Sequence, residues 1–433
     1  MATTVREQIS AVLSGAVAYE PGLDALTVTP PSEADPVLVT VLHDTCAALW
    51  RGGWQPTELH RVVGRRGDPT HPHLVIDAIA AHLRRFARTA VDERWLAQAD
   101  ALGARVWWRI DATYLHEFGV RFRLDRVAVL DLVLTLLRVL SDLPPIEVLI
   151  PPPGAAASAT RGGRRDGAAR ADAGVLDRVR ALLAKAESTT YPPEAEAYTA
   201  KAQQLVARHS LDEALLVARS GDPTVVPFAR RLGVDHPYEA EKASMLDAVA
   251  RANRCHAVWS PEFGFATVFG FEADLDAVDL LYTSLLVQAH RAMAQTEPPG
   301  GKAGRSRLKT FRQSFLVAYA VRIGERLAGA VEATLSEATL SEAALFDATL
   351  SEVAGRAGAA GPAGPGDRTE AVDLLPVLAS RDAQIRETMR AVFPRTVRVR
   401  GSRVDSREGW NSGRAAANRA VLHAPAGGGR SPS

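Results

Sequence analysis

Two stretches rich in Pro, Gly, Ala and Arg most constrain how this chain of 433 residues folds. Residues 151–174 (PPPGAAASATRGGRRDGAARADAG) and 354–368 (AGRAGAAGPAGPGDR) contain almost no side chains that a core would bury. We interpret both as disordered linkers. They divide the chain into an N-terminal region (1–150), a middle region and a C-terminal segment (369–433) that we expect to hold a helix and a basic tail.

The spacing of apolar residues predicts a mostly helical N-terminal region. One helix is expected over Leu74–Ala90. Leu124–Leu140 is apolar on most faces, so we expect it to be the central helix of this region.

The middle region begins with a unit of three predicted helices at 175–219. Val175, Val179 and Leu183 form a stripe at helical spacing, and Pro192-Pro193 is typical of the first turn of a second helix. Ser210–Glu213 matches a capping box that would open a short third helix.

Residues 220–332 then favour an α+β module. Its expected elements are helices over Ala240–Asn253, Glu272–Met293 and Leu308–Ala330, and strands over His256–Trp259 and Phe265–Phe269.

Residues 333–353 contain a five-residue repeat (ATLSE, ATLSE, AALFD, ATLSE). Ala, Leu and Glu are strong helix formers, so we favour a helical extension of the preceding helix. The alternative is one coil of a pentapeptide solenoid, which needs several coils to bury a core. The expected fold is therefore mainly α with a small α+β module, in several domains with partly disordered linkers and tail.

Three phrases carry a resemblance to a known family: VRALLAKAEST (179–189), EAEAYTAKAQQLVARHSLDEALL (194–216) and FATVFGFEADLDAVDLLYTSLL (265–286). The first two resemble domain-of-unknown-function family 2786, which occurs in actinobacteria and in phage or plasmid proteins, and the third resembles the region that usually follows this unit. The resemblance implies no particular activity. Its polar residues, which could form one face, are Lys185, Glu187, Glu196, Lys201 and His209.

Charge is distributed unevenly, although 51 Lys and Arg nearly balance 50 Asp and Glu. A surface that binds nucleic acid needs such local basic excess. Trp410 is the only aromatic ring in the tail, so the sequence gives little support for base stacking. The candidate phosphate contacts are Lys302, Arg305, Arg307, Lys309 and Arg312 in one acid-free segment, and Arg395, Arg398, Arg400 and Arg403 in the tail.

These charges favour a non-enzymatic nucleic-acid-associated or adaptor protein, and other functions stay open. Asp274, Asp276 and Asp279 would suit a metal-dependent hydrolase or nuclease, although acids in a first helical turn also suit the helix dipole. A third alternative is a scaffold that binds protein partners. Whether the chain is an enzyme is left undecided.

We expect no cofactor and no metal site, because two cysteines cannot supply a four-thiolate zinc centre. No signal peptide is evident, and the most apolar stretch, Val127–Leu140, is too short to span a bilayer. A cytoplasmic protein with no membrane partner is therefore expected.

Overall fold

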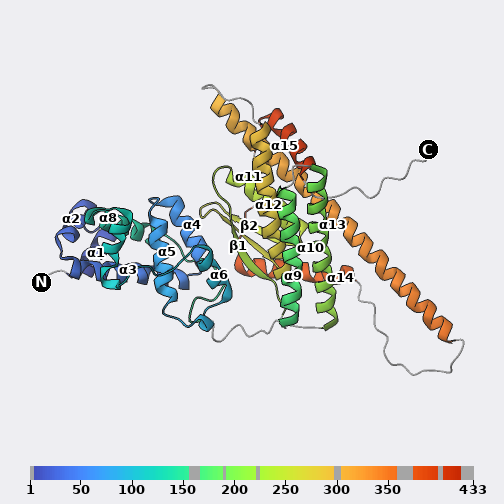
Figure 1. Ribbon diagram of the computed structural model, residues 1–433, viewed down its shortest axis with the longest axis horizontal. Helices are drawn as coiled ribbons and strands as arrows, with labels where there is room; N and C mark the ends of the chain where they lie inside the picture. Colours follow the sequence, from blue (N-terminus) through green and yellow to red (C-terminus); the bar gives the residue numbers. More distant parts are fainter. Residues whose placement is uncertain are drawn as a thin grey trace. The chain divides into compact units, whose positions relative to one another are not determined.

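The computed structural model describes residues 4–155, 166–188, 192–220, 225–296, 304–357, 374–397 and 403–420. They form two compact units, residues 1–163 and 164–433 (Figure 1). The boundary falls inside the first predicted linker. Among the described helices, none combines the length and the apolar composition that crossing a bilayer requires.

The N-terminal unit is helical, as predicted. Its helices are α1 (Val5–Leu13), α2 (Tyr19–Val28), α3 (Pro31–Arg51), α4 (Pro56–Arg66), α5 (His71–Leu83), α6 (Glu93–Ala101), α7 (Tyr114–Phe122) and α8 (Arg126–Ser141). The helix expected over Leu74–Ala90 is shorter, because α5 ends at Leu83 and Arg88–Ala90 forms a separate 3-10 turn.

Helix α8 is the centre of this unit, which confirms the prediction for Leu124–Leu140. The side chain of Asp125 caps its N-terminus by accepting a hydrogen bond from the Ala128 amide at 2.8 Å. The helix packs against α1, α2, α3, α4, α5 and α7. Its buried residues are Val129, Leu130, Leu132, Val133, Leu134, Leu136, Leu137 and Leu140.

The C-terminal unit combines helices with a small sheet. Its elements are α9 (Asp166–Ser188), α10 (Pro192–Ser220), β1 (Phe228–Gly233), α11 (Glu239–Ala252), β2 (His256–Ser260), β3 (Phe265–Gly270), α12 (Glu272–Thr296), α13 (Arg305–Ala357), α14 (Leu374–Val392) and α15 (Arg407–Arg419). The sheet is antiparallel in the order β1-β3-β2, and every residue of β3 is buried.

The sequence predictions for this unit hold in part. The β2–β3 hairpin and its flanking helices are confirmed. Strand β1 was not expected, because Arg230 and Arg231 interrupt its apolar pattern (FARRLG). The five-residue repeat is helical, since 333–352 lies within α13.

Three boundaries differ from the predictions. Helix α13 continues to Ala357, so the first residues of the predicted second linker (354–368) are helical. The expected third helix at Ser210 does not exist as a separate element, because α10 continues without a break to Ser220. Helix α9 begins at Asp166, so the last residues of the predicted first linker are helical. Ala and Arg are good helix formers, which accounts for this earlier start.

One core holds the C-terminal unit together. It contains Val179 of α9, Ala202 of α10, Val268 of β3, Phe315 of α13 and Ala416 of α15, all of them buried. The segment that matches the family phrases, the α+β module and the tail helix α15 therefore share one hydrophobic core.

Candidate functional site

The start of α15 packs against the first turns of α13. Arg307 Nη2 lies 3.0 Å from Glu408 Oε2, although the two residues are 101 positions apart in the sequence. The buried Ser314 hydroxyl accepts hydrogen bonds from the amides of Asp405 at 3.2 Å and Ser406 at 3.0 Å. These contacts join the two basic segments that the sequence singles out.

Two glycines allow the helices to approach so closely. A Cβ atom at Gly409 would collide with the carbonyl oxygen of Phe311, and one at Gly413 with that of Phe315. Along the edge of this contact, Arg326 donates hydrogen bonds to the carbonyls of Ala417 and Ala420. The position of α15 on α13 is therefore fixed by close backbone packing.

We use the term basic junction for Arg307, Lys309 and Arg312 of α13 together with Arg403, which precedes α15, and Arg407, the first residue of α15. Four of them are exposed and Arg312 is half-buried. Asp405 and Glu408 are the acids within the same two segments, which leaves a net charge of +3.

An open hollow lies beside α15 at this junction. It is lined by Val404, Asp405, Arg407 and Trp410, and its volume is about 460 Å³. Trp410 is half-buried, and Val404 is 43% exposed. Among the described residues, the hollow thus combines an indole, an aliphatic side chain, a guanidinium and a carboxylate.

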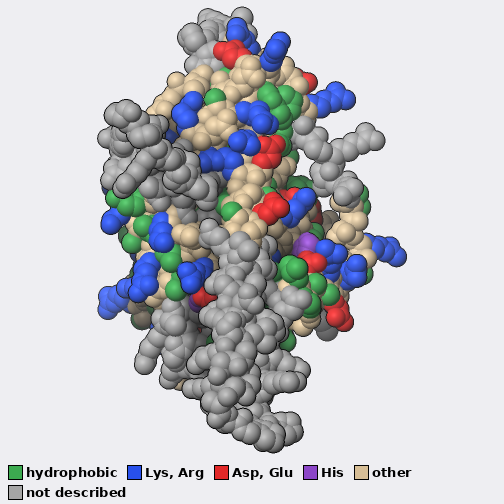
Figure 2. All heavy atoms as spheres, turned by 90° about the vertical axis from the view of Figure 1, so that its right-hand side faces the viewer, with side chains coloured by type: hydrophobic (Ala, Val, Ile, Leu, Met, Phe, Trp, Pro, Cys, Tyr) green, Lys and Arg blue, Asp and Glu red, His purple; other side chains and the backbone are tan. Residues whose placement is uncertain are grey.

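The other predicted phosphate contacts are not all at this junction. Arg395 is exposed two residues after Phe393, whose ring packs edge-on against Phe269 of β3, so Arg395 lies by the sheet. Lys302, Arg398 and Arg400 lie outside the described residues, and Arg305 is described in its backbone alone. On the face in Figure 2, Lys and Arg are spread out with acidic side chains among them.

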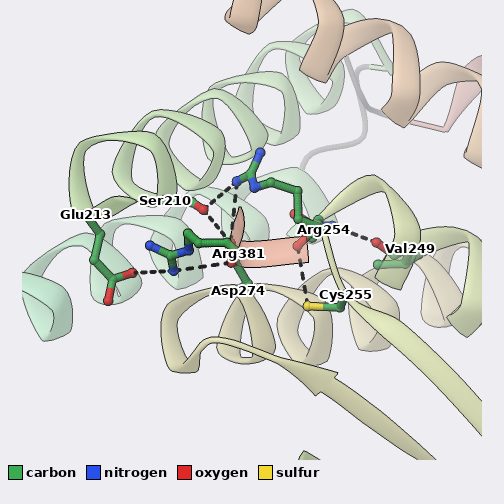
Figure 3. A network of polar contacts seen from close by, with 8 residues as sticks. Ser210, Glu213, Val249, Arg254, Cys255, Asp274 and Arg381 are labelled. Atoms are coloured by element: carbon green, nitrogen blue, oxygen red, sulfur yellow. Dashed lines mark hydrogen bonds and ion pairs between the residues drawn. The ribbon is translucent and has the colours of Figure 1, made fainter. Parts of the chain in front are cut away.

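A second cluster of charged residues is buried beneath α14 (Figure 3). Asp274, in the first turn of α12, is 1% exposed. It accepts a hydrogen bond from the Ser210 hydroxyl at 2.5 Å, and Arg254 Nη2 lies 3.4 Å from the same carboxylate oxygen. Arg254 also donates to the Ser210 hydroxyl. Ser210 therefore bonds to Asp274 across the core and does not cap a helix.

Arg381 of α14 completes this cluster. Its Nη2 atom lies 3.8 Å from Glu213 and 4.0 Å from Asp274, and its guanidinium carbon is 3.7 Å from the centre of the Phe271 ring. Burial lowers the pKa of Arg381, and the nearby carboxylates of Asp274 and Glu213 oppose that shift. Two arginines and two carboxylates balance in charge, so the arrangement is typical of a structural ion cluster.

The three aspartates proposed for a metal-dependent hydrolase have different surroundings. Asp274 lies in the buried cluster, while Asp276 forms an ion pair with Arg230 at 2.6 Å. Burial raises the pKa of Asp279. Across the described ranges, no group of three or more His, Cys, Asp or Glu side chains is arranged to hold a metal ion. The hydrolase stays a prediction without a metal site in this part of the chain.

Of the polar residues of the family phrases, those with described side chains are exposed or half-buried. Lys185 is exposed, and its ammonium lies 5.6 Å from the centre of the Tyr198 ring. Lys201 is exposed and donates to Gln204 at 3.2 Å, and His209 is half-buried. The side chains of Glu187 and Glu196 lie outside the described part.

Arg254 and Arg381 are the charged residues that sequence reasoning missed. Arg254 has φ of +57° and follows Asn253, the C-cap residue of α11, at a position where Gly or Asn is usual. An arginine tolerated there is a local signal that its side chain is needed. Arg381 gives no such signal, because its pocket is built from α10, α12 and the residue that follows β3.

Comparison with known proteins yields one match. Residues 174–213 match the family described as "Protein of unknown function (DUF2786)", and the matched segment spans part of α9 and α10. No curated protein and no solved structure matches the chain.

Proposed function

Residues 174–213 belong to a family of unknown function, so we propose a function from the geometry: the chain is a non-enzymatic protein that binds nucleic acid through the basic junction. The convergence of the two basic segments on one another carries this proposal. Arg307 and Glu408 hold the start of α15 against α13, at 3.0 Å. Lys309, Arg403 and Arg407 are exposed around this contact.

Exposed cations of this kind suit phosphate groups. Each phosphate that a Lys or Arg neutralises releases condensed counterions, which makes binding favourable at low salt and weaker as salt rises. Both cysteines are free and buried, which fits the reducing cytoplasm, where we propose that binding takes place. An adaptor role would follow if the rest of the chain held a protein partner meanwhile.

The test is a salt titration of binding to labelled single-stranded and duplex oligonucleotides, using the full chain. A variant with Lys309→Ala, Arg403→Ala and Arg407→Ala loses three cations of the junction. We expect weaker binding and a plot of log affinity against log salt that is flatter by about 2 to 3. Removing everything after Pro394 is unsuitable, because Ala416 and Ala417 belong to the core.

A matched control removes the same charge elsewhere. Arg178, Arg251 and Arg390 are exposed on α9, α11 and α14, and replacing all three by Ala changes the net charge equally. Equal losses of affinity in the two triple variants would show that overall charge, and not the junction, governs binding. Absence of binding by the wild-type chain at low salt would overturn the proposal.

A further inference from the structure

The hollow beside α15 has the composition of a stacking site. Arg407 and Trp410 are three residues apart near the start of α15, so they lie on the same side of the helix, one turn apart. Val404, three residues before Arg407, adds an aliphatic wall. The hollow is wide open to solvent, so it suits a flat group that stacks on the surface, such as a base, and not a ligand that must be enclosed.

We propose that this hollow binds one unpaired base of a single-stranded nucleic acid, stacked on Trp410 while Arg407 contacts the adjacent phosphate. This inference rests on the proposed function and names the form of nucleic acid. The indole and the guanidinium both offer flat faces to an aromatic heterocycle. The carboxylate of Asp405, which also lines the hollow, offers an acceptor for an N–H group on the edge of a base, such as the N3–H of thymine.

The position of the hollow beside the basic junction provides the phosphate contacts that such a strand needs. Arg403 precedes the lining residue Val404, and the Arg307–Glu408 pair connects Arg407 and its neighbours to α13. A strand that follows these cations passes the hollow. In a duplex, each base is already stacked and paired, so entering the hollow would require breaking a base pair. Single strands are therefore preferred over duplexes.

The experiment compares two labelled probes of equal length and charge: an oligothymidylate and the corresponding abasic strand. Both offer the same phosphates, and only the first offers bases. We expect the full-length wild-type chain to bind the oligothymidylate about tenfold more tightly. Trp410→Ala removes this preference and leaves binding to the abasic strand unchanged, whereas Trp410→Phe, which keeps an aromatic face, retains most of it.

Controls separate the two proposals. Thermal melting of each variant reports whether the C-terminal unit, whose core includes α15, is still folded, and Trp410→Phe provides a conservative check. Equal wild-type affinity for both probes overturns the stacking site and leaves phosphate binding intact. Binding to neither probe overturns the stacking site together with the proposed function.

Discussion

The guanidinium carbon of Arg381 lies 3.7 Å from the centre of the Phe271 ring, so α14 is joined to the residue between β3 and α12. Arg381 and Ile385 are the buried residues among the described side chains of α14. A surface helix with so little buried area depends strongly on each contact. The Arg381–Phe271 contact is therefore central to how α14 is held on the C-terminal unit.

We expect Arg381→Ala to lower the free energy of unfolding of the C-terminal unit by about 1–3 kcal/mol. The variant loses the cation–π contact and leaves the buried Asp274 and Glu213 with less positive charge nearby. The distances of 3.8 and 4.0 Å to these carboxylates place the effect below that of an ideally paired buried arginine. Urea unfolding of the full chain measures it.

Arg381→Met is the matched control, because it keeps an unbranched apolar side chain beside Phe271 and removes the charged guanidinium. If packing dominates, Met restores much of the stability that Ala loses. If charge dominates, both variants are equally unstable. Unchanged unfolding of Arg381→Ala would contradict the structural role of this residue.

The same cluster predicts that Asp274→Asn and Asp276→Asn differ in stability. Asp274 is 1% exposed, and its loss of charge leaves Arg254 and Arg381 without their shared carboxylate, at a cost of about 3–5 kcal/mol. Asp276 and Arg230 are each 27% exposed in their side chains, so Asp276→Asn costs about 1 kcal/mol or less. Chemical unfolding of both variants, with the wild type as reference, is the measurement.

This pair also bears on the hydrolase alternative. A catalytic role for these aspartates would lower Mg²⁺-dependent cleavage in both variants, including the well-folded Asp276→Asn. A purely structural role for Asp274 lowers the stability of the Asp274→Asn variant and leaves any Mg²⁺-dependent cleavage by the Asp276→Asn variant unchanged. Similar stability of the two variants would argue against the buried cluster as the structure has it.

The sequence predicted what depends on local pattern. The apolar stripe of α8, the β2–β3 hairpin and the helical repeat within α13 all follow from residue spacing and propensity. The predictions were wrong where contacts between residues far apart in the sequence determine the structure. Ser210 matches a capping box, yet its hydroxyl bonds to Asp274, 64 residues away, and α10 continues past it.

The candidate site shows the same division. The two basic segments were visible in the sequence as acid-poor runs, and Arg307, Lys309 and Arg403 were named from it. The sequence did not reveal that the two segments meet, because their meeting depends on the contact of Gly409 and Gly413 with the backbone of α13. The role of Trp410 likewise requires the hollow, which no spacing in the sequence reveals.

The histidines of the N-terminal unit predict a loss of stability in acid. Burial lowers the pKa of His82 from 6.5 to about 4, and burial also lowers the pKa of His43 and His71. A base with a lowered folded-state pKa binds fewer protons when folded than when unfolded. The stability that neutral His82 contributes to the folded N-terminal unit is therefore present above pH 6.5 and is lost as pH falls toward 4.

For His82 alone we expect a loss of about 1–2 kcal/mol over this range, after allowance for partial solvent exposure. His82→Phe keeps a ring next to Trp50 and Phe86, whose centroids lie 6.4 and 5.2 Å from that of His82. Unfolding free energies measured from pH 7 to 4 should fall less steeply for this variant. An identical pH profile would show that His82 titrates normally in the folded unit.

Replacing glycine by alanine is expected to destabilise the protein at one position in α15 and to stabilise it at one position in α13. Gly413→Ala places a Cβ against the carbonyl oxygen of Phe315, so α15 must shift from α13. We expect the free energy of unfolding to fall by about 1–3 kcal/mol, together with weaker binding of the oligothymidylate because the hollow is distorted.

Gly329, also helical, has nothing within 4 Å of its Cβ position, so Gly329→Ala should stabilise α13 by about 0.5–1 kcal/mol. Thermal melting and oligonucleotide binding of both variants give the comparison. A stabilised Gly413→Ala with unchanged binding would contradict the close packing that forms the basic junction.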